Sequence, residues 1–154
     1  KMSNKKVLIL YKIISYFNLI IAGIFFLIFL TSLTVMSQKL LILLYMMLMV
    51  SVIMLSYLSF SLQRSIADKT ISLPEATRSG LRINAYITLA YSFFQFSGLL
   101  GIILKKNEIL KSLPPEYAGE ALGVINFMLI FLLIFVIALF IHIFLTFSYL
   151  KKIK

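Results

Sequence analysis

The chain has 154 residues, of which 62% are hydrophobic, and its mean hydropathy is +1.06. Soluble domains are about 45 to 50% apolar and about 25% charged, whereas 13% of this chain is charged, so a soluble globular fold is excluded. The net charge of +10 does not predict nucleic-acid binding, because most basic residues flank apolar segments on one side of a membrane. In that position they orient the chain and contact anionic lipid head groups.

Four apolar segments are each long enough to cross a bilayer, which takes about 20 residues of α-helix. They cover residues 13–35, 40–62, 83–104 and 124–150. Between them we expect a short connection at 37–39, an inner loop at 64–80 and an outer loop at 105–120. The sequence therefore predicts an all-α polytopic membrane protein, built as one antiparallel bundle of four transmembrane helices.

The distribution of lysine and arginine predicts the orientation of this bundle. With the N-terminus inside, eleven of the fifteen basic residues lie on inner segments, and the outer ones are Lys39, Lys105, Lys106 and Lys111. The positive-inside rule therefore favours cytoplasmic N- and C-termini and a cytoplasmic middle loop. We expect a bacterial inner membrane, from the compactness of the chain, with anionic lipid head groups as partners at the cytoplasmic face.

Both longer loops contain a serine-leucine-proline motif. Residues 72–75 are typical of a capping box, with Ser72 as the cap and Glu75 reaching back to it, so the third helix is predicted to begin near Leu73. Residues 112–116 show a similar pattern. An internal repeat would produce this similarity, but so would two helices that each start with a cap followed by proline. The second interpretation is favoured, because nothing else in the flanking spans aligns.

None of the four apolar cores contains Asp, Glu, Lys or Arg. Ion-coupled carriers generally hold an ionisable group at depth, so this absence disfavours them. The spans instead carry neutral polar residues at helical spacing, in what the orientation makes the cytoplasmic half or the middle of the membrane. The candidate polar group consists of Asn18, Ser59, Gln63, Asn84, Thr88, Tyr91, Gln95, His142 and Tyr149.

Two interpretations of this polar group remain open. The residues could hydrogen-bond between helices, at about 0.6 kcal/mol per bond on average, or they could line a vestibule that admits a lipid head group or a small ligand. The first is favoured. His142 is the only histidine and the chain has no cysteine, so no multi-histidine or thiolate metal site is possible, and we expect no metal and no cofactor.

Small residues four apart predict close helix packing in membranes. Ser97 and Gly101 have this spacing in the third span, as do Gly119 and Gly123 at the start of the fourth. We therefore expect the outer ends of these two helices to pack closely.

Three classes of function fit the sequence. A non-enzymatic protein, either an accessory subunit of a membrane complex or a small homo-oligomer, is favoured. A transporter or channel is the alternative, and a pore would require the third span to turn Asn84, Thr88, Tyr91 and Gln95 towards a symmetry axis. A lipid-handling enzyme is the third class, and its chemistry would rest on His142 with help from Tyr149 or Tyr91.

Overall fold

The structure is a computed structural model that describes residues 4–33, 39–111 and 114–153. These residues form four α-helices and no strand: α1 (Asn4–Ser32), α2 (Lys39–Ala67), α3 (Glu75–Lys111) and α4 (Pro115–Leu150). Each helix is long and apolar enough to cross a membrane. The predicted all-α fold with four membrane-spanning helices is confirmed.

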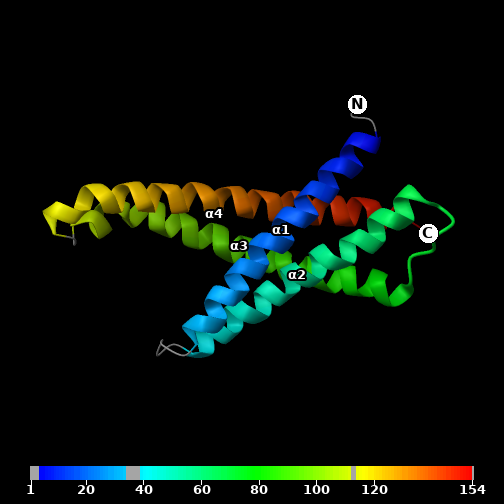
Figure 1. The fold of residues 1–154 in the computed structure, drawn as a ribbon, viewed down its shortest axis with the longest axis horizontal. Helices are drawn as coiled ribbons and strands as arrows, with labels where there is room; N and C mark the ends of the chain where they lie inside the picture. The colour runs from blue at the N-terminus through cyan, green and yellow to red at the C-terminus, as the bar shows by residue number, and fades with distance from the viewer. Residues whose placement is uncertain (1–3, 34–38, 112–113, 154) are drawn as a thin grey trace.

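The helices are arranged as two hairpins that cross at an angle (Figure 1). Helix α1 packs along α2 and α3 packs along α4, while α2 against α3 and α1 against α4 join the hairpins. Beyond the crossing, the end where α1 meets α2 and the end where α3 meets α4 point in different directions (Figure 1). Of the predicted connection at 37–39, residues 37 and 38 lie outside the described residues, and Lys39 is the first residue of α2.

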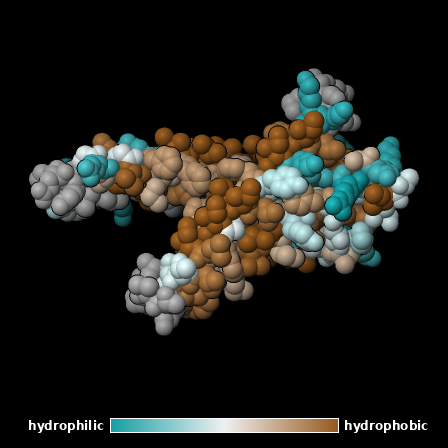
Figure 2. All heavy atoms as spheres, in the orientation of Figure 1, coloured by the Kyte–Doolittle hydropathy of each residue, from teal (hydrophilic) through white to brown (hydrophobic). Residues whose placement is uncertain are grey.

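Apolar side chains fill two clusters along this crossing. The cluster nearer the termini draws on all four helices and includes Tyr11, Leu55, Leu81 and Ile143, and the other is formed by Ala22, Met49, Val52, Tyr91, Phe135 and Leu139. Large apolar residues also cover the outside, as Figure 2 shows around the middle of the molecule, with hydrophilic residues gathered at the end that holds the termini. This surface is suited to acyl chains rather than to water.

The second and third connections between helices are shorter than the sequence predicted. Helix α2 continues to Ala67 and α3 begins at Glu75, so the connection predicted at 64–80 is 68–74. Helix α3 continues to Lys111 and α4 begins at Pro115, so most of the predicted outer loop at 105–120 is helical. The predicted boundaries stopped where charged residues begin, but lysine and glutamate are good helix formers and a helix can continue past the membrane surface.

The predicted capping box at the start of α3 is wrong. The N–H of Arg78 donates to the carbonyl oxygen of Pro74 at 3.0 Å, so Pro74 rather than Ser72 precedes the first helical residue. Helix α4 likewise starts after Pro114, which has φ −55° and ψ 139°, with a second proline at the first helical position. Proline suits this place because the first N–H groups of a helix have no partner within it. Residues 112–113 lie outside the described residues.

A local turn closes the connection between α2 and α3. The carboxylate of Asp68 accepts hydrogen bonds from the side-chain hydroxyl and the backbone N–H of Thr70, at 2.7 and 2.9 Å. These bonds hold the pKa of the Asp68 carboxyl below its usual value. The hydroxyl of Ser65 also donates to the carbonyl oxygen of Ile71 at 2.8 Å, and this bond holds the connection against the last turns of α2.

Candidate functional site

A hydrogen-bonded polar cluster lies where α1, α2 and α4 meet. Its side chains are between 0 and 7% exposed, so the cluster is enclosed by the helices. We call it the polar cluster, and its members are Tyr11, Ser15, Asn18, Ser59, Gln63, His142 and Thr146. Of the nine residues in the predicted polar group, the structure brings four together here, and Tyr149 borders them.

His142 is the centre of the polar cluster. Its Nε2 lies 2.9 Å from the Ser59 hydroxyl and 3.2 Å from the Ser15 hydroxyl. Its Nδ1 lies 3.1 Å from the side-chain amide nitrogen of Asn18. One ring from α4 therefore connects side chains of α1 and α2, and so links the two hairpins.

The number of available hydrogens sets the direction of these bonds. The hydroxyl of Ser15 donates to the carbonyl oxygen of Tyr11 at 2.8 Å, and that of Ser59 to the carbonyl oxygen of Leu55 at 2.7 Å. Each hydroxyl has a single hydrogen, so Nε2 of His142 is the donor to these oxygens. Its Nδ1 accepts from the amide of Asn18. The bonds are therefore those of a neutral imidazole that carries its hydrogen on Nε2.

Tyr11 extends the cluster towards the termini. Its hydroxyl lies 2.8 Å from both the Ser59 and the Thr146 hydroxyls, and Thr146 donates to the carbonyl oxygen of His142 at 2.8 Å. The Tyr11 ring meets the His142 ring edge-on at 5.4 Å between centroids and contacts the Tyr149 ring at 5.5 Å. The contacts of Tyr11 with Ser59, Thr146, His142 and Tyr149 each join two helices, as expected of interhelical hydrogen bonding and packing.

The polar residues of α3 do not join the polar cluster. Asn84 donates to the carbonyl oxygen of Gly80 in its own helix at 2.8 Å, and Gln95 donates to the Tyr91 hydroxyl at 2.6 Å. Thr88 is fully buried, and its hydroxyl has no hydrogen-bond partner among the described residues. Thr88 and Tyr91 are buried inside the single chain, at 0 and 3% exposure, so this helix does not turn its whole polar stripe towards a symmetry axis as a pore would require.

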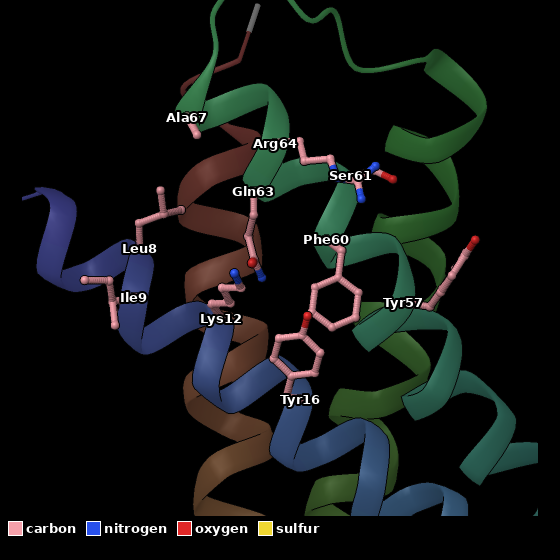
Figure 3. Close-up of a pocket in the computed structure, with 10 residues that line it drawn as sticks. All are labelled: Leu8, Ile9, Lys12, Tyr16, Tyr57, Phe60, Ser61, Gln63, Arg64 and Ala67. Atoms are coloured by element: carbon pink, nitrogen blue, oxygen red, sulfur yellow. The ribbon is translucent and has the colours of Figure 1, made fainter.

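Two cavities open on either side of the crossing. The one farther from the termini, of about 410 Å³, lies between the diverging hairpins, and its walls are aromatic except for Gln95, Met128 and Leu132. Its aromatic residues are Phe25, Phe29, Tyr45, Tyr91, Phe127 and Phe131. The other cavity, of about 440 Å³, is a groove between α1 and α2 near the termini (Figure 3).

The predicted close packing by small residues does not occur within the described chain. A Cβ atom added at Gly101, Gly119 or Gly123 would meet nothing within 4 Å, and Ser97 is exposed. Close approach is found at Gly80 instead, where an added Cβ would lie 3.0 Å from Cδ1 of Leu58. The sequence did not predict this contact, although Ala76 stands four positions before Gly80 and gives it the same small-residue spacing.

The sequence pattern did not predict the groove between α1 and α2. Lys12 and Arg64 counted only among the basic residues that indicate orientation, and Tyr16 and Tyr57, which line the same groove, stood outside the predicted polar group. One signal was present in the sequence. Tyr57 and Arg64 are seven residues apart, and so are two turns apart on one face of α2.

The fold and the site define a class of protein rather than a particular one. Four apolar helices with lipid-compatible surfaces are compatible with a small integral membrane protein. Comparison of the chain with protein families, curated proteins and solved structures gave no match.

Proposed function

We propose that the protein is a non-enzymatic membrane subunit that associates with further copies of itself through the outer parts of α3 and α4. The observation that carries this proposal is the placement of the small residues. Gly101, Gly119 and Gly123 face open space in the single chain, and Ser97 is exposed. All four lie towards the turn that joins α3 to α4.

These glycines are unfavourable in a single chain but can stabilise a contact between two copies. Glycine within a helix is about 1 kcal/mol less favourable than alanine, and the packing among the described residues does not use these three glycines. In a membrane, small residues let two helix backbones approach closely, which provides the dispersion contacts that drive association. The end of the α3–α4 hairpin diverges from the other hairpin (Figure 1), so a second copy has access to it.

The same proposal includes an orientation. Cytoplasmic termini place eleven of the fifteen basic residues on the inner side, which supports insertion with the α3–α4 turn facing outwards, and the compactness of the chain favours a bacterial inner membrane.

Mass measurement of the full chain tests the proposal. Native mass spectrometry or mass photometry in lipid nanodiscs is expected to show a dimer or a larger homo-oligomer. Replacing Gly101 and Gly123 together by leucine should reduce the oligomeric fraction by tenfold or more, while circular dichroism remains unchanged. The matched control is Gly23→Leu, because Gly23 also faces open space but has no small residue four positions away.

Two results would overturn the proposal. The unmodified chain could be monomeric at every protein-to-lipid ratio, or the double variant could associate as strongly as the unmodified chain. If a different chain co-purified with the protein at a fixed stoichiometry, the protein would be an accessory subunit rather than a homo-oligomer.

A further inference from the structure

The groove between α1 and α2 combines positive charge with an opening at the membrane boundary. Its volume is about 440 Å³, within the range of about 300 to 1,000 Å³ typical of small-molecule sites. Lys12 contributes a cation from α1 and Arg64 contributes one from α2, and no carboxylate is among the residues that line the groove. Lys12 and Arg64 therefore have no opposite charge beside them in the groove, and a groove of this kind is suited to binding an anion.

The side chains around these cations form an amphipathic wall. In Figure 3, Lys12 and Gln63 point into the space between the helices, Tyr16 and Phe60 close one end, and Arg64 lies along the α2 edge. The Tyr16 and Phe60 rings lie 4.6 Å apart between centroids. Gln63 is held in place because its amide nitrogen donates to the Ser15 hydroxyl at 3.0 Å.

The position of the groove relative to the membrane indicates which anion it would meet. Lys12 immediately precedes the apolar segment 13–35, and Arg64 is two residues beyond the apolar segment 40–62. Both cations therefore stand at the boundary between hydrocarbon and head groups, where lysine and arginine extend their charged ends towards phosphate. Tyr16 and Tyr57, which are 48 and 63% exposed, are of the residue type that anchors in this layer.

From this arrangement we propose that the groove binds the phosphate of an anionic glycerophospholipid. Arg64 and Lys12 donate charge-assisted hydrogen bonds to the phosphate oxygens, and the acyl chains pass over the Tyr16 and Phe60 end into the bilayer. Basic pockets between transmembrane helices are a recurrent form of lipid head-group recognition. The proposal does not depend on the oligomeric state of the protein.

Native mass spectrometry of the delipidated full chain in mild detergent tests this site. Phosphatidylglycerol is expected to bind about tenfold more tightly than phosphatidylcholine. The variant that combines Lys12→Gln with Arg64→Gln should lose roughly tenfold or more of this affinity, because charge-assisted hydrogen bonds are removed. The variant Lys12→Arg should retain it. Circular dichroism checks that the double variant is folded, which is expected because both side chains are exposed.

The control removes the same charge elsewhere. Lys5→Gln combined with Lys69→Gln lowers the net charge equally but leaves the groove intact, because neither residue lines it. An equal loss in this control, or equal binding of both lipids, would show that only the net charge attracts lipid and would overturn the site. If millimolar inorganic phosphate displaced the lipid completely, the ligand would be soluble phosphate and the lipid assignment would be wrong.

Discussion

Replacing His142 by leucine should destabilise the protein, because the imidazole makes three of the contacts that join the hairpins. Leucine has a similar volume, so the main loss is of hydrogen bonds rather than of packing. Bonds of this kind contribute about 0.6 kcal/mol on average in membrane proteins, so three amount to about 2 kcal/mol. The upper measured value of about 1.7 kcal/mol per bond sets a ceiling of roughly 5 kcal/mol.

The lower figure is expected because two partners keep other bonds. The Ser59 hydroxyl still contacts Tyr11, and the Ser15 hydroxyl still accepts from Gln63. Asn18 loses the most, because its amide oxygen is already unpaired among the described residues. Its amide nitrogen keeps only a 3.5 Å contact with the Ala138 carbonyl oxygen.

The free energy of unfolding is measured by steric trapping in bicelles, with reversibility shown by refolding. Phe144→Leu serves as the control, because Phe144 is 72% exposed on the same helix and should change stability by less than about 0.5 kcal/mol. His142→Gln keeps one donor and one acceptor and should recover part of the loss. A His142→Leu variant as stable as the unmodified chain would refute the structural role of the polar cluster.

Two further measurements address helix packing and topology. Gly80→Leu should destabilise the chain by about 1 to 3 kcal/mol, because an added Cβ already lies 3.0 Å from a side chain of α2. Gly23→Leu, at an open site, should leave the stability unchanged. Equal melting temperatures of the two variants in detergent would contradict this packing. Since the chain has no cysteine, Asp68→Cys and Glu108→Cys each create a single label site. A membrane-impermeant maleimide should label the second in intact cells and the first only after permeabilisation, and labelling of both from one side would rule out the proposed threading.

Sequence patterns predicted the helices well and their ends poorly. Hydropathy identified four spans because the requirement for about 20 apolar residues is local. It placed the boundaries at the first charged residues, although α3 continues through Lys105 and Lys106 to Lys111. The capping-box prediction also failed locally, because Pro74 rather than Ser72 stands immediately before α3.

For the polar residues too, the sequence predicted one part of the arrangement and missed another. Helical spacing placed Asn18 in the predicted polar group, and the structure uses it in the polar cluster together with Tyr11 and Ser15 of the same helix. The same reasoning grouped Asn84 with Asn18, although Asn84 bonds within its own helix. Spacing along one helix cannot show which face meets which neighbour, because that depends on how helices rotate and cross.

The sequence by itself determined that this chain has four helices fit for a membrane, because a bilayer leaves a backbone few ways to satisfy its hydrogen bonds. It also determined the charge asymmetry on which the orientation proposal depends. Only the tertiary structure decided that Ser15 and Ser59 meet at His142, that Lys12 and Arg64 share a groove, and that Gly80 rather than Gly101 is a close contact. The meeting at His142 and the contact at Gly80 follow from the crossing of two hairpins, whereas the groove follows from the packing of α1 against α2 within one hairpin.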